Sequence, residues 1–362
     1  MELIIQQGFI GLEKIESEWN QLFNKLAYPL YSQSIIWHKA YLRNLMIDSS
    51  RCYYFCIYKN NKLIAVFPLE NNKKKFLKTL SFSDTSHFGF NLNSILIDEY
   101  ENTQIVFEFL FQSLKKEKSI KWDVIYLKRV LDNSQYSLCK TSDSKLTFQT
   151  LGSSCDILPI QNYKKTHEMF SRNFKRNLQK SRKKILGMEN VKFESSQDIE
   201  TLEDYFNYFL DVEASGWKGL KGSKSAIKLN GNVRNFYQEA MRGFAKNGQM
   251  EINLLSINNK PIAAQFAIII EPTVFLLKIG YDENSRRISP GNILLEHKLK
   301  EYEVNPNLTI LNLISNADWH TNWKPNVLLS HNIYNCKNLF IARNIKLLFW
   351  LEGNVKKILS KL

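Results

Sequence analysis

The sequence predicts an α/β (α+β) fold divided between two domains, and three observations lead to this expectation. Short apolar runs rich in β-forming residues alternate with amphipathic helical runs along most of the chain. The 362 residues, 44% of them hydrophobic and 13% aromatic, are many for one hydrophobic core and sufficient for two. Small residues at 152–154 separate the two halves. We therefore expect domains at residues 1–152 and 153–340, followed by an amphipathic helix at 341–362.

The first half is expected to begin with a strand at Leu3–Gln6 and a helix at Ile15–Leu26. A second helix is expected at Ser34–Leu45, because Ser34 is suited to the N-cap position. Two strands around a polar turn at 59–62 predict a hairpin. The hairpin strands are 53–58 and 63–69, further strands are expected at 79–82, 94–97 and 122–127, and a helix at 105–114. The polar-aromatic loop at 82–92 could line a substrate pocket or be an ordinary connection.

The second half opens with a strand at Cys155–Leu158 and the most basic tract of the chain, Tyr163–Lys184. Apolar residues recur there at helical spacing, so the tract is expected to be a helix with an apolar stripe and a cationic face, ended by Gly187. Like charges repel on an isolated helix, which favours an anionic partner for this face over simple solvation. The stripe is Phe170, Phe174, Leu178 and Ile185, and the cations are Lys164, Lys165, Arg172, Lys175, Arg176, Lys180, Arg182, Lys183 and Lys184.

Further helices and strands alternate up to the C-terminus. A helix at Asp198–Ala214 leads into Glu213–Ile227, a loop rich in glycine and lysine with one large anchor, Trp217. Loops of this composition often carry function. Helices are then expected at 232–247 and 293–302, strands at 250–257, 261–270, 274–281, 308–314 and 328–335, and a polar loop with two tryptophans at 315–325.

The stretch Lys278–Leu299 carries the clearest functional signal. A β-rich run is followed by a polar turn with Arg286 and Arg287, and then by Ser-Pro-Gly directly before a helix. Pro290 suits a first helical turn and Gly291 lets a ligand approach the backbone. Free N–H groups and the helix dipole favour an anion at such a terminus. The pattern predicts a phosphate or pyrophosphate site.

Bulk charge and cysteine usage restrict the partners and the compartment. The formal net charge of +14 favours anionic partners, which include nucleic acid, a phosphate-rich cofactor, an acidic glycan and an anionic membrane surface. The five cysteines form neither a disulfide framework nor a zinc-binding spacing. The N-terminus does not have the pattern of a signal peptide. We therefore expect a cytoplasmic protein without a bound metal.

Five segments, taken together and in order, resemble a known family. They are RNFKRNLQKSRKKILG (172–187), EASGWKG (213–219), KPIAAQFAI (260–268), LKIGYDENSRRISPGNILL (277–295) and WKPN (323–326). In this order they resemble the GNAT-like acyltransferase domain of CelD-type polysaccharide-biosynthesis proteins, a family related to the Fem-type aminoacyltransferases. The resemblance covers about 170–335. It implies two GNAT-like domains in tandem, each a mixed sheet flanked by helices, with acyl transfer to an amine as the reference reaction.

The resemblance also implies that the basic helix and the Ser-Pro-Gly helix border one cleft. It implies acyl-CoA as the co-substrate, with acetyl-CoA the first candidate. Residues 287–292 keep one arginine and one glycine of the usual Arg/Gln-x-x-Gly-x-Gly/Ala pyrophosphate loop, at a shifted spacing. The expected cofactor-binding residues are Arg286, Arg287, Ser289, Gly291 and Asn292.

Acyl transfer to an amine needs a proton acceptor and donors aimed at the developing oxyanion. Asp282 and Glu213 are the candidate carboxylates, since both lie beside aromatic residues that could raise a carboxyl pKa, although both could be structural hydrogen-bond acceptors. Tyr281 could donate a proton to a leaving thiolate, and His320 is a further possible base. Substrate-binding candidates are Arg172, Arg176, Trp217, Lys218, Lys278, Trp323 and Lys324.

Three functions remain open from the sequence. The first is an N-acyltransferase that moves an acyl group from acyl-CoA to an amino sugar or another cell-envelope or polysaccharide precursor. The second takes its acyl group from aminoacyl-tRNA, which would suit the basic helix. The third is a non-catalytic module that binds polyanions. The C-terminal helix could cap a domain or make a peripheral contact with an anionic membrane.

Overall fold

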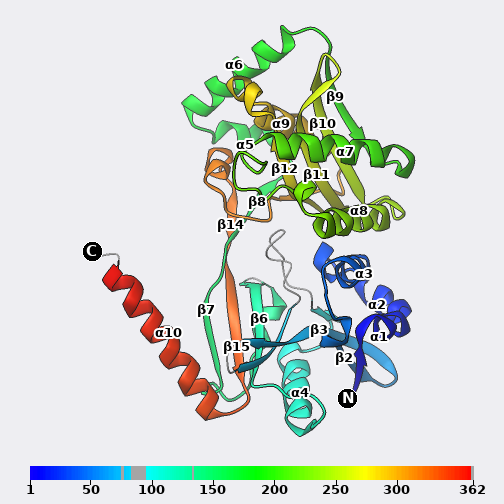
Figure 1. The fold of residues 1–362 in the computed structure, drawn as a ribbon, viewed down its shortest axis with the longest axis vertical. Helices are drawn as coiled ribbons and strands as arrows, with labels where there is room; N and C mark the ends of the chain where they lie inside the picture. The colour runs from blue at the N-terminus through cyan, green and yellow to red at the C-terminus, as the bar shows by residue number, and fades with distance from the viewer. Residues whose placement is uncertain (75–76, 83–94, 133, 360–362) are drawn as a thin grey trace.

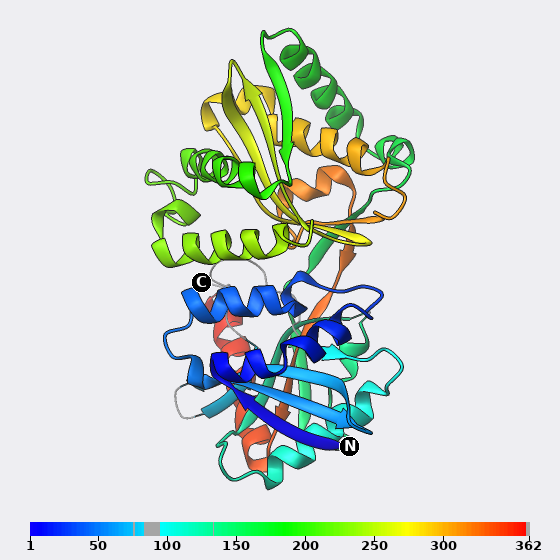
Figure 2. The same ribbon diagram turned by 90° about the vertical axis from the view of Figure 1, so that its right-hand side faces the viewer.

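The computed structural model describes residues 1–74, 77–82, 95–132 and 134–359. Two lobes lie one above the other, each built on a sheet with helices on both faces (Figures 1 and 2). The expected mixed α/β architecture is confirmed. The predicted loop at 82–92 falls, apart from Phe82, outside the described residues. Among the described residues, no helix combines the length and the apolarity needed to span a bilayer.

The first sheet has the strand order β1-β2-β3-β4-β6-β15-β7, with β5 paired to β3; β15 (Ser330–Cys336) comes from the far end of the chain. Helices α1, α2 and α3 cover one face, and α4 packs its apolar stripe on the other. The elements are β1 (Glu2–Gln7), α1 (Gly8–Lys14), α2 (Glu16–Phe23), α3 (Ile35–Asn44), β2 (Cys52–Lys59), β3 (Lys62–Lys74), β4 (Leu77–Ser81), β5 (Leu96–Ile97), α4 (Thr103–Lys116), β6 (Val124–Leu131) and β7 (Thr147–Leu151).

The second sheet has the order β14-β8-β13-β12-β11-β10-β9. Helices α7 and α8 cover one face, and α5, α6 and α9 the other. The elements are β8 (Cys155–Pro159), α5 (Tyr163–Glu168), α6 (Arg172–Leu186), β9 (Val191–Ser196), α7 (Ile199–Ser215), α8 (Gly231–Ala245), β10 (Met250–Ile257), β11 (Lys260–Ile270), β12 (Thr273–Tyr281), the 3₁₀ helix η5 (Glu283–Ile288), α9 (Pro290–Tyr302), β13 (Ile310–Asn312) and β14 (Asn326–Leu328).

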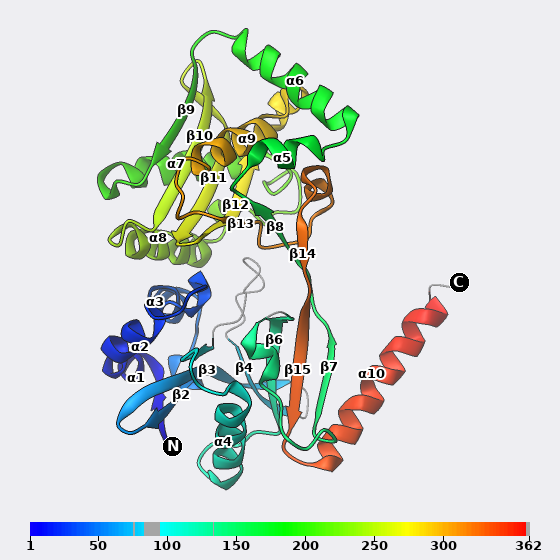
Figure 3. The same cartoon turned by 180° about the vertical axis from the view of Figure 1, so that it is seen from behind.

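The chain crosses between the lobes twice. It passes upward from β7 to β8 and returns from β14 to β15 (Ser330–Cys336), which pairs with β6 and β7 in the first sheet (Figure 3). The boundaries 1–152, 153–340 and 341–362 remain a prediction, but a strand from the far end of the second segment completes the sheet of the first. Helix α10 (Leu339–Leu359) buries Ala342 and Ile345 against that sheet.

Local signals placed several helix ends correctly. The Oγ atom of Ser34 accepts the Trp37 N–H at the start of α3, and α6 ends at Gly187 as predicted. The helix expected at 15–26 corresponds to α2, which ends at Phe23, and α1 was missed; Ile15, with a φ of −105° and a ψ of 3°, separates the two helices. The basic tract is likewise two helices, because Ser171 caps α6 by accepting the Phe174 N–H. Strands β7 and β9 were missed.

The lobes share a continuous apolar core. Trp37 of α3 contacts Phe236 of α8 edge-to-face, with ring centroids 4.7 Å apart. Tyr31, just before α3, meets Phe275 of β12 at 5.3 Å. Because aromatic contacts of this kind bury large apolar areas, the two lobes are held together as one packed body.

Candidate active site

Strand β12, the turn η5 and helix α9 form the predicted strand-turn-helix unit. Pro290 occupies the first turn of α9 as expected, and Ser289 before it has a φ of +49°. A Cβ atom added at Gly291 would meet only Tyr281 Cδ1, at 3.8 Å, so a ligand can approach the backbone there. The N–H groups of Asn292 and Ile293 both donate to Ser289 O. Since proline has no N–H, the helix end offers fewer free donors than expected.

Arg286 and Arg287 are both exposed on η5. Helix α6 packs against η5 and against α9, so the structure brings the cationic helix beside the Ser-Pro-Gly turn. Arg172 and Arg176 lie exposed near the start of α6. These four arginines give this end of the lobe a positive surface. Asn292, another expected cofactor residue, accepts a hydrogen bond of 3.4 Å from Trp323 Nε1 and thereby ties α9 to the loop before β14.

Glu213 is buried at the end of α7, directly against β12. Gly280 makes this possible, since a Cβ atom there would lie 2.7 Å from Glu213 Cα. Glu213 Oε1 accepts from Lys218 Nζ at 3.1 Å and Oε2 from the Ile227 N–H at 2.9 Å. Lys218 Nζ also donates to the Ile279 carbonyl at 3.1 Å. Glu213 therefore fixes both ends of the 213–227 loop on β12.

Lys278 lies two residues before Gly280, beside a register shift between β11 and β12. Desolvation, followed by the charge of Lys218, lowers its pKa to about 8, although Glu213 acts in the opposite direction. Its Nζ lies 5.7 Å from the centroid of the Tyr237 ring. Tyr237 in turn lies 6.4 Å from Trp37 of the first lobe. Lys278 therefore faces the junction of the two lobes, and its ammonium group loses its proton at a lower pH than an exposed lysine does.

Asp282 has a different environment from the one expected. It caps η5 by accepting from the Asn284 N–H at 3.0 Å, and Lys260 Nζ lies 3.2 Å from its carboxylate. Burial acts to raise its pKa, but the Asn284 and Lys260 hydrogen bonds outweigh burial and the pKa is lowered. The expected rise is wrong for this residue. Tyr281 beside it is half-buried, and burial followed by the charge of Glu283 raises its pKa.

The remaining expected substrate residues differ in exposure. Trp217 is 61% exposed and has Lys218 Nζ 5.9 Å above its ring, so it is free to stack on a ligand. Trp323 has no exposed surface and packs between Phe170 and Phe174, so its ring cannot bind substrate in this structure. Lys324 is exposed, with a φ of +54°.

Two buried polar pairs were not predicted from the sequence. Asp156 of β8 and His320 form a buried pair at 2.7 Å between Oδ2 and Nδ1, and burial lowers the pKa of the imidazole despite this partner. Lys298 of α9 pairs with Glu251 of β10 at 3.0 Å. Both pairs lie inside the lobe and support the sheet. The described residues contain no cluster of side chains that could hold a metal ion.

Comparison with known proteins gives the family that the second lobe matches. Residues 172–319 match the acetyltransferase (GNAT) domain family. Most of the second lobe therefore carries an acetyltransferase (GNAT) domain. A comparison with curated proteins found no significant match.

Solved structures share the architecture of the whole chain. FemX aligns with a TM-score of 0.58 at 10% identity, covering 93% of this chain and 98% of that one. A protein of unknown function from Bacteroides thetaiotaomicron gives 0.57 at 13% identity, with 92% and 100% covered. The C-terminal domain of a putative lysylphosphatidylglycerol synthetase from Agrobacterium fabrum gives 0.52 at 7%, with 92% and 95% covered. The expected likeness in fold to the Fem-type proteins is confirmed, and the CelD-type branch remains a prediction.

Proposed function

We propose that the protein is an N-acyltransferase that holds a phosphate-bearing acyl donor at the start of α9 and receives an acceptor amine near Lys278. The acceptor class we favour is an amino sugar or another cell-envelope or polysaccharide precursor. The observation that carries the proposal is the continuity of one strand-turn-helix unit. Lys278 and Tyr281 on β12, Arg286 and Arg287 on η5, and Gly291 on α9 all fall within residues 278–291.

The reaction forms a bond between the amine nitrogen and the acyl carbon and breaks the bond from that carbon to the leaving group. Negative charge develops on the acyl oxygen, and the Lys278 ammonium, held in a partly desolvated position, would stabilise it. The amine loses a proton and the leaving group gains one. The Tyr281 hydroxyl is our candidate for the second transfer, as its raised pKa keeps it protonated at neutral pH. The proton from the amine replaces the one that Tyr281 gives up, so no net proton is consumed.

The carboxylates then have supporting roles. Glu213 orients Lys218 and the loop that carries Trp217, so it acts as a positioning residue. Asp282 holds the turn that presents Arg286 and Arg287, because it accepts the N–H at the start of η5. Trp217 would contact the acceptor through its exposed ring. Arg172, Arg176 and Lys324 would contribute charge around the donor.

Acyl-CoA is the donor that we favour, with acetyl-CoA as the probe. Aminoacyl-tRNA is the second candidate, and two observations favour it. The exposed face of α6 carries cations along its length, and the first turn of α9 has few free N–H groups for a pyrophosphate. We place the reaction in the cytoplasm, with α10 as a possible contact to an anionic membrane.

A thermal-shift series tests the donor. Acetyl-CoA should raise the melting temperature of the wild-type protein, because a ligand that binds only the folded state stabilises it. The double variant Arg286→Ala/Arg287→Ala should lose most of this increase, while Lys221→Ala/Lys224→Ala, which removes two exposed charges elsewhere in the lobe, should keep it.

The outcomes separate the two donors and the non-catalytic alternative. Stabilisation by charged tRNA but not by acetyl-CoA would move the assignment to the second donor. If the folded Arg286→Ala/Arg287→Ala variant bound acetyl-CoA like the wild type, the donor site would be wrong. Equal, salt-sensitive binding of unrelated polyanions, with no transfer to any amine, would contradict the enzymatic proposal as a whole.

A further inference from the structure

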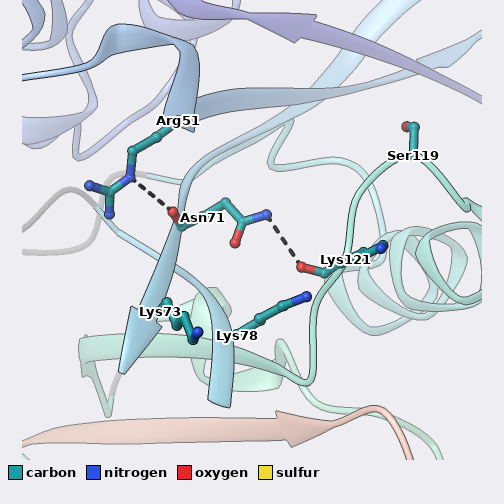
Figure 4. A pocket seen from close by; sticks show the side chains of 6 residues that line it. All are labelled: Arg51, Asn71, Lys73, Lys78, Ser119 and Lys121. Atoms are coloured by element: carbon teal, nitrogen blue, oxygen red, sulfur yellow. Dashed lines mark hydrogen bonds between the residues drawn. The ribbon is translucent and has the colours of Figure 1, made fainter. Parts of the chain in front are cut away.

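A second cationic site lies in the first lobe, outside the GNAT domain. A pocket of about 470 Å³ is lined by six residues, of which four are cations and none is acidic (Figure 4). These residues are Arg51, Asn71, Lys73, Lys78, Ser119 and Lys121. No role in acyl transfer follows from their position.

Four chain segments build this pocket: β4 carries Lys78, and hydrogen bonds link the other three. Arg51 precedes β2, Asn71 and Lys73 end β3, and Lys121 follows α4. Arg51 Nε donates to Asn71 O at 3.2 Å, and Asn71 Nδ2 donates to Lys121 O at 3.3 Å (Figure 4). Asn71 therefore links the segments that carry Arg51 and Lys121. The cations converge because the backbone that carries them is fixed.

Lys73 and Lys78 are directly opposed partners in the antiparallel pair β3·β4. Opposed residues share one face of the sheet, and like charges in this position are destabilising. Figure 4 shows both side chains at the same pocket. No carboxylate forms an ion pair with either lysine, with Arg51 or with Lys121 among the described residues. An anion placed between these side chains would remove the repulsion.

The carboxylates on the neighbouring segments are already engaged by backbone groups. Asp123 Oδ2 accepts the Lys78 N–H at 2.8 Å, and Glu117 Oε1 accepts the Ser119 N–H at 2.7 Å. They hold the segments in place and are not among the residues that line the pocket.

The groove of about 860 Å³ between α2, α3 and α8 provides a contrast. It is also rich in charge, but three of the four cations that line it are paired with carboxylates. Lys39 lies 2.6 Å from Glu16, Arg43 lies 2.6 Å from Glu239, and Arg242 lies 2.5 Å from Glu203. Ion pairing of this kind leaves little net charge for a ligand. In the smaller pocket, by contrast, none of the four cations has a carboxylate partner among the described residues, and Arg51 donates only to Asn71 O and Asn72 Oδ1.

We propose that the pocket of Arg51, Lys73, Lys78 and Lys121 binds the phosphate or diphosphate group of an anionic ligand. A guanidinium can bind two phosphate oxygens at once, and lysines add point charges around them. The hydroxyl of Ser119 and the amide of Asn71 can donate further hydrogen bonds. The same chemistry is offered by a soluble phosphate ester and by a phospholipid head group. This site is independent of the donor site on α9.

Calorimetric titration with inorganic pyrophosphate in phosphate-free buffer tests the proposal. The wild-type protein should bind, and Lys73→Gln/Lys78→Gln should weaken binding by about tenfold or more, because charge-assisted hydrogen bonds are the strong ones. Lys116→Gln/Lys118→Gln, which removes two exposed charges from the adjacent segment, should bind like the wild type. Pyrophosphate binding that the Arg286→Ala/Arg287→Ala variant retains is assigned to the pocket and not to the start of α9.

Two further measurements distinguish the ligand sources and protect against a folding artefact. Without anion, Lys73→Gln/Lys78→Gln should melt no lower than the wild type, since it removes a repulsion. The wild-type protein is then sedimented with vesicles. Binding to phosphatidylglycerol vesicles but not to phosphatidylcholine vesicles, lost in the pocket variant, would identify a lipid head group as the ligand. Pyrophosphate binding without vesicle binding would identify a soluble ligand. Unchanged pyrophosphate and vesicle binding in a folded pocket variant would overturn the proposal, as would a wild-type protein that binds neither.

Discussion

Burial and the nearby charge of Lys218 lower the pKa of Lys278 into a range near neutral pH. Its pKa of about 8 places its loss of a proton within an accessible pH range. If its ammonium stabilises the oxyanion, transfer activity should fall as the pH rises through about 8. Lys278→Arg should move this falling limb to higher pH, because a guanidinium stays protonated. A pH–rate profile of the wild type and of Lys278→Arg measures the pH at which activity falls in each. If activity falls at the same pH in both proteins, Lys278 is not the group that causes the fall.

The same residue should give a signature in stability. Its pKa is lowered from 10.5 to about 8 on folding, so between these values the unfolded chain binds more protons than the folded one. Below pH 8 the folded protein bears the full free-energy penalty of a charged, desolvated Lys278. As the pH rises towards 10.5, this penalty disappears and the free energy of unfolding rises. A tenfold change in proton affinity corresponds to about 1.4 kcal/mol. Lys278→Met should lack this increase in denaturant titrations at pH 7.5 to 10.

The sequence names candidate site residues but not the contacts between them. Glu213, Lys218 and Lys278 were all expected, but their cluster depends on Gly280 letting α7 touch β12. The Asp156–His320 pair spans 164 positions and is created by strand order, so no local spacing reveals it. Trp323 was expected to bind substrate because the sequence shows only an aromatic residue in a polar loop. The structure shows that Phe170 and Phe174 enclose its ring.

At the scale of elements, α3 and α8 join the lobes through a close helix contact. A Cβ atom added at Gly243 of α8 would lie 2.4 Å from Ile36 Cγ2 of α3. Gly243→Ala should destabilise the protein by about 1–3 kcal/mol, because the added methyl group overpacks the contact. This effect outweighs the higher helix propensity of alanine compared with glycine. Ile36→Ala removes the clashing atom, so the double variant should recover part of the loss. Denaturant unfolding of all four proteins measures this coupling, and additive effects would contradict the contact.

Helix ends were predictable where the signal is local. Ser34 and Gly187 act on groups within one turn, and Pro290 needs only the first turn of its helix. The missed strands β7 and β9 lack such signals. β7 takes its place in the sheet from β15, which lies far away in the sequence. Their pairing is therefore a property of the folded chain.

At the scale of the whole molecule, β15 makes the first lobe depend on the end of the second. It lies between β6 and β7, with Tyr334 stacked between Tyr126 and Phe148 at 4.5 and 4.7 Å. A fragment of residues 1–152 would leave both neighbouring strands without their partner. Unpaired strand edges of this kind cost hydrogen bonds and favour aggregation.

We therefore expect the fragment 1–152 to lack a cooperative thermal transition, even though it contains most of the first lobe. The matched fragment 1–338 keeps β15 and removes only α10. It should fold, with a lower melting temperature, because Val124 and Cys336 lose the cover of Ala342 and Ile345. Circular dichroism melts and amide hydrogen exchange of the two fragments provide the comparison. A cooperative melt of 1–152 matching that of 1–338 would show that the first lobe is an independent folding unit and that β15 only docks on it.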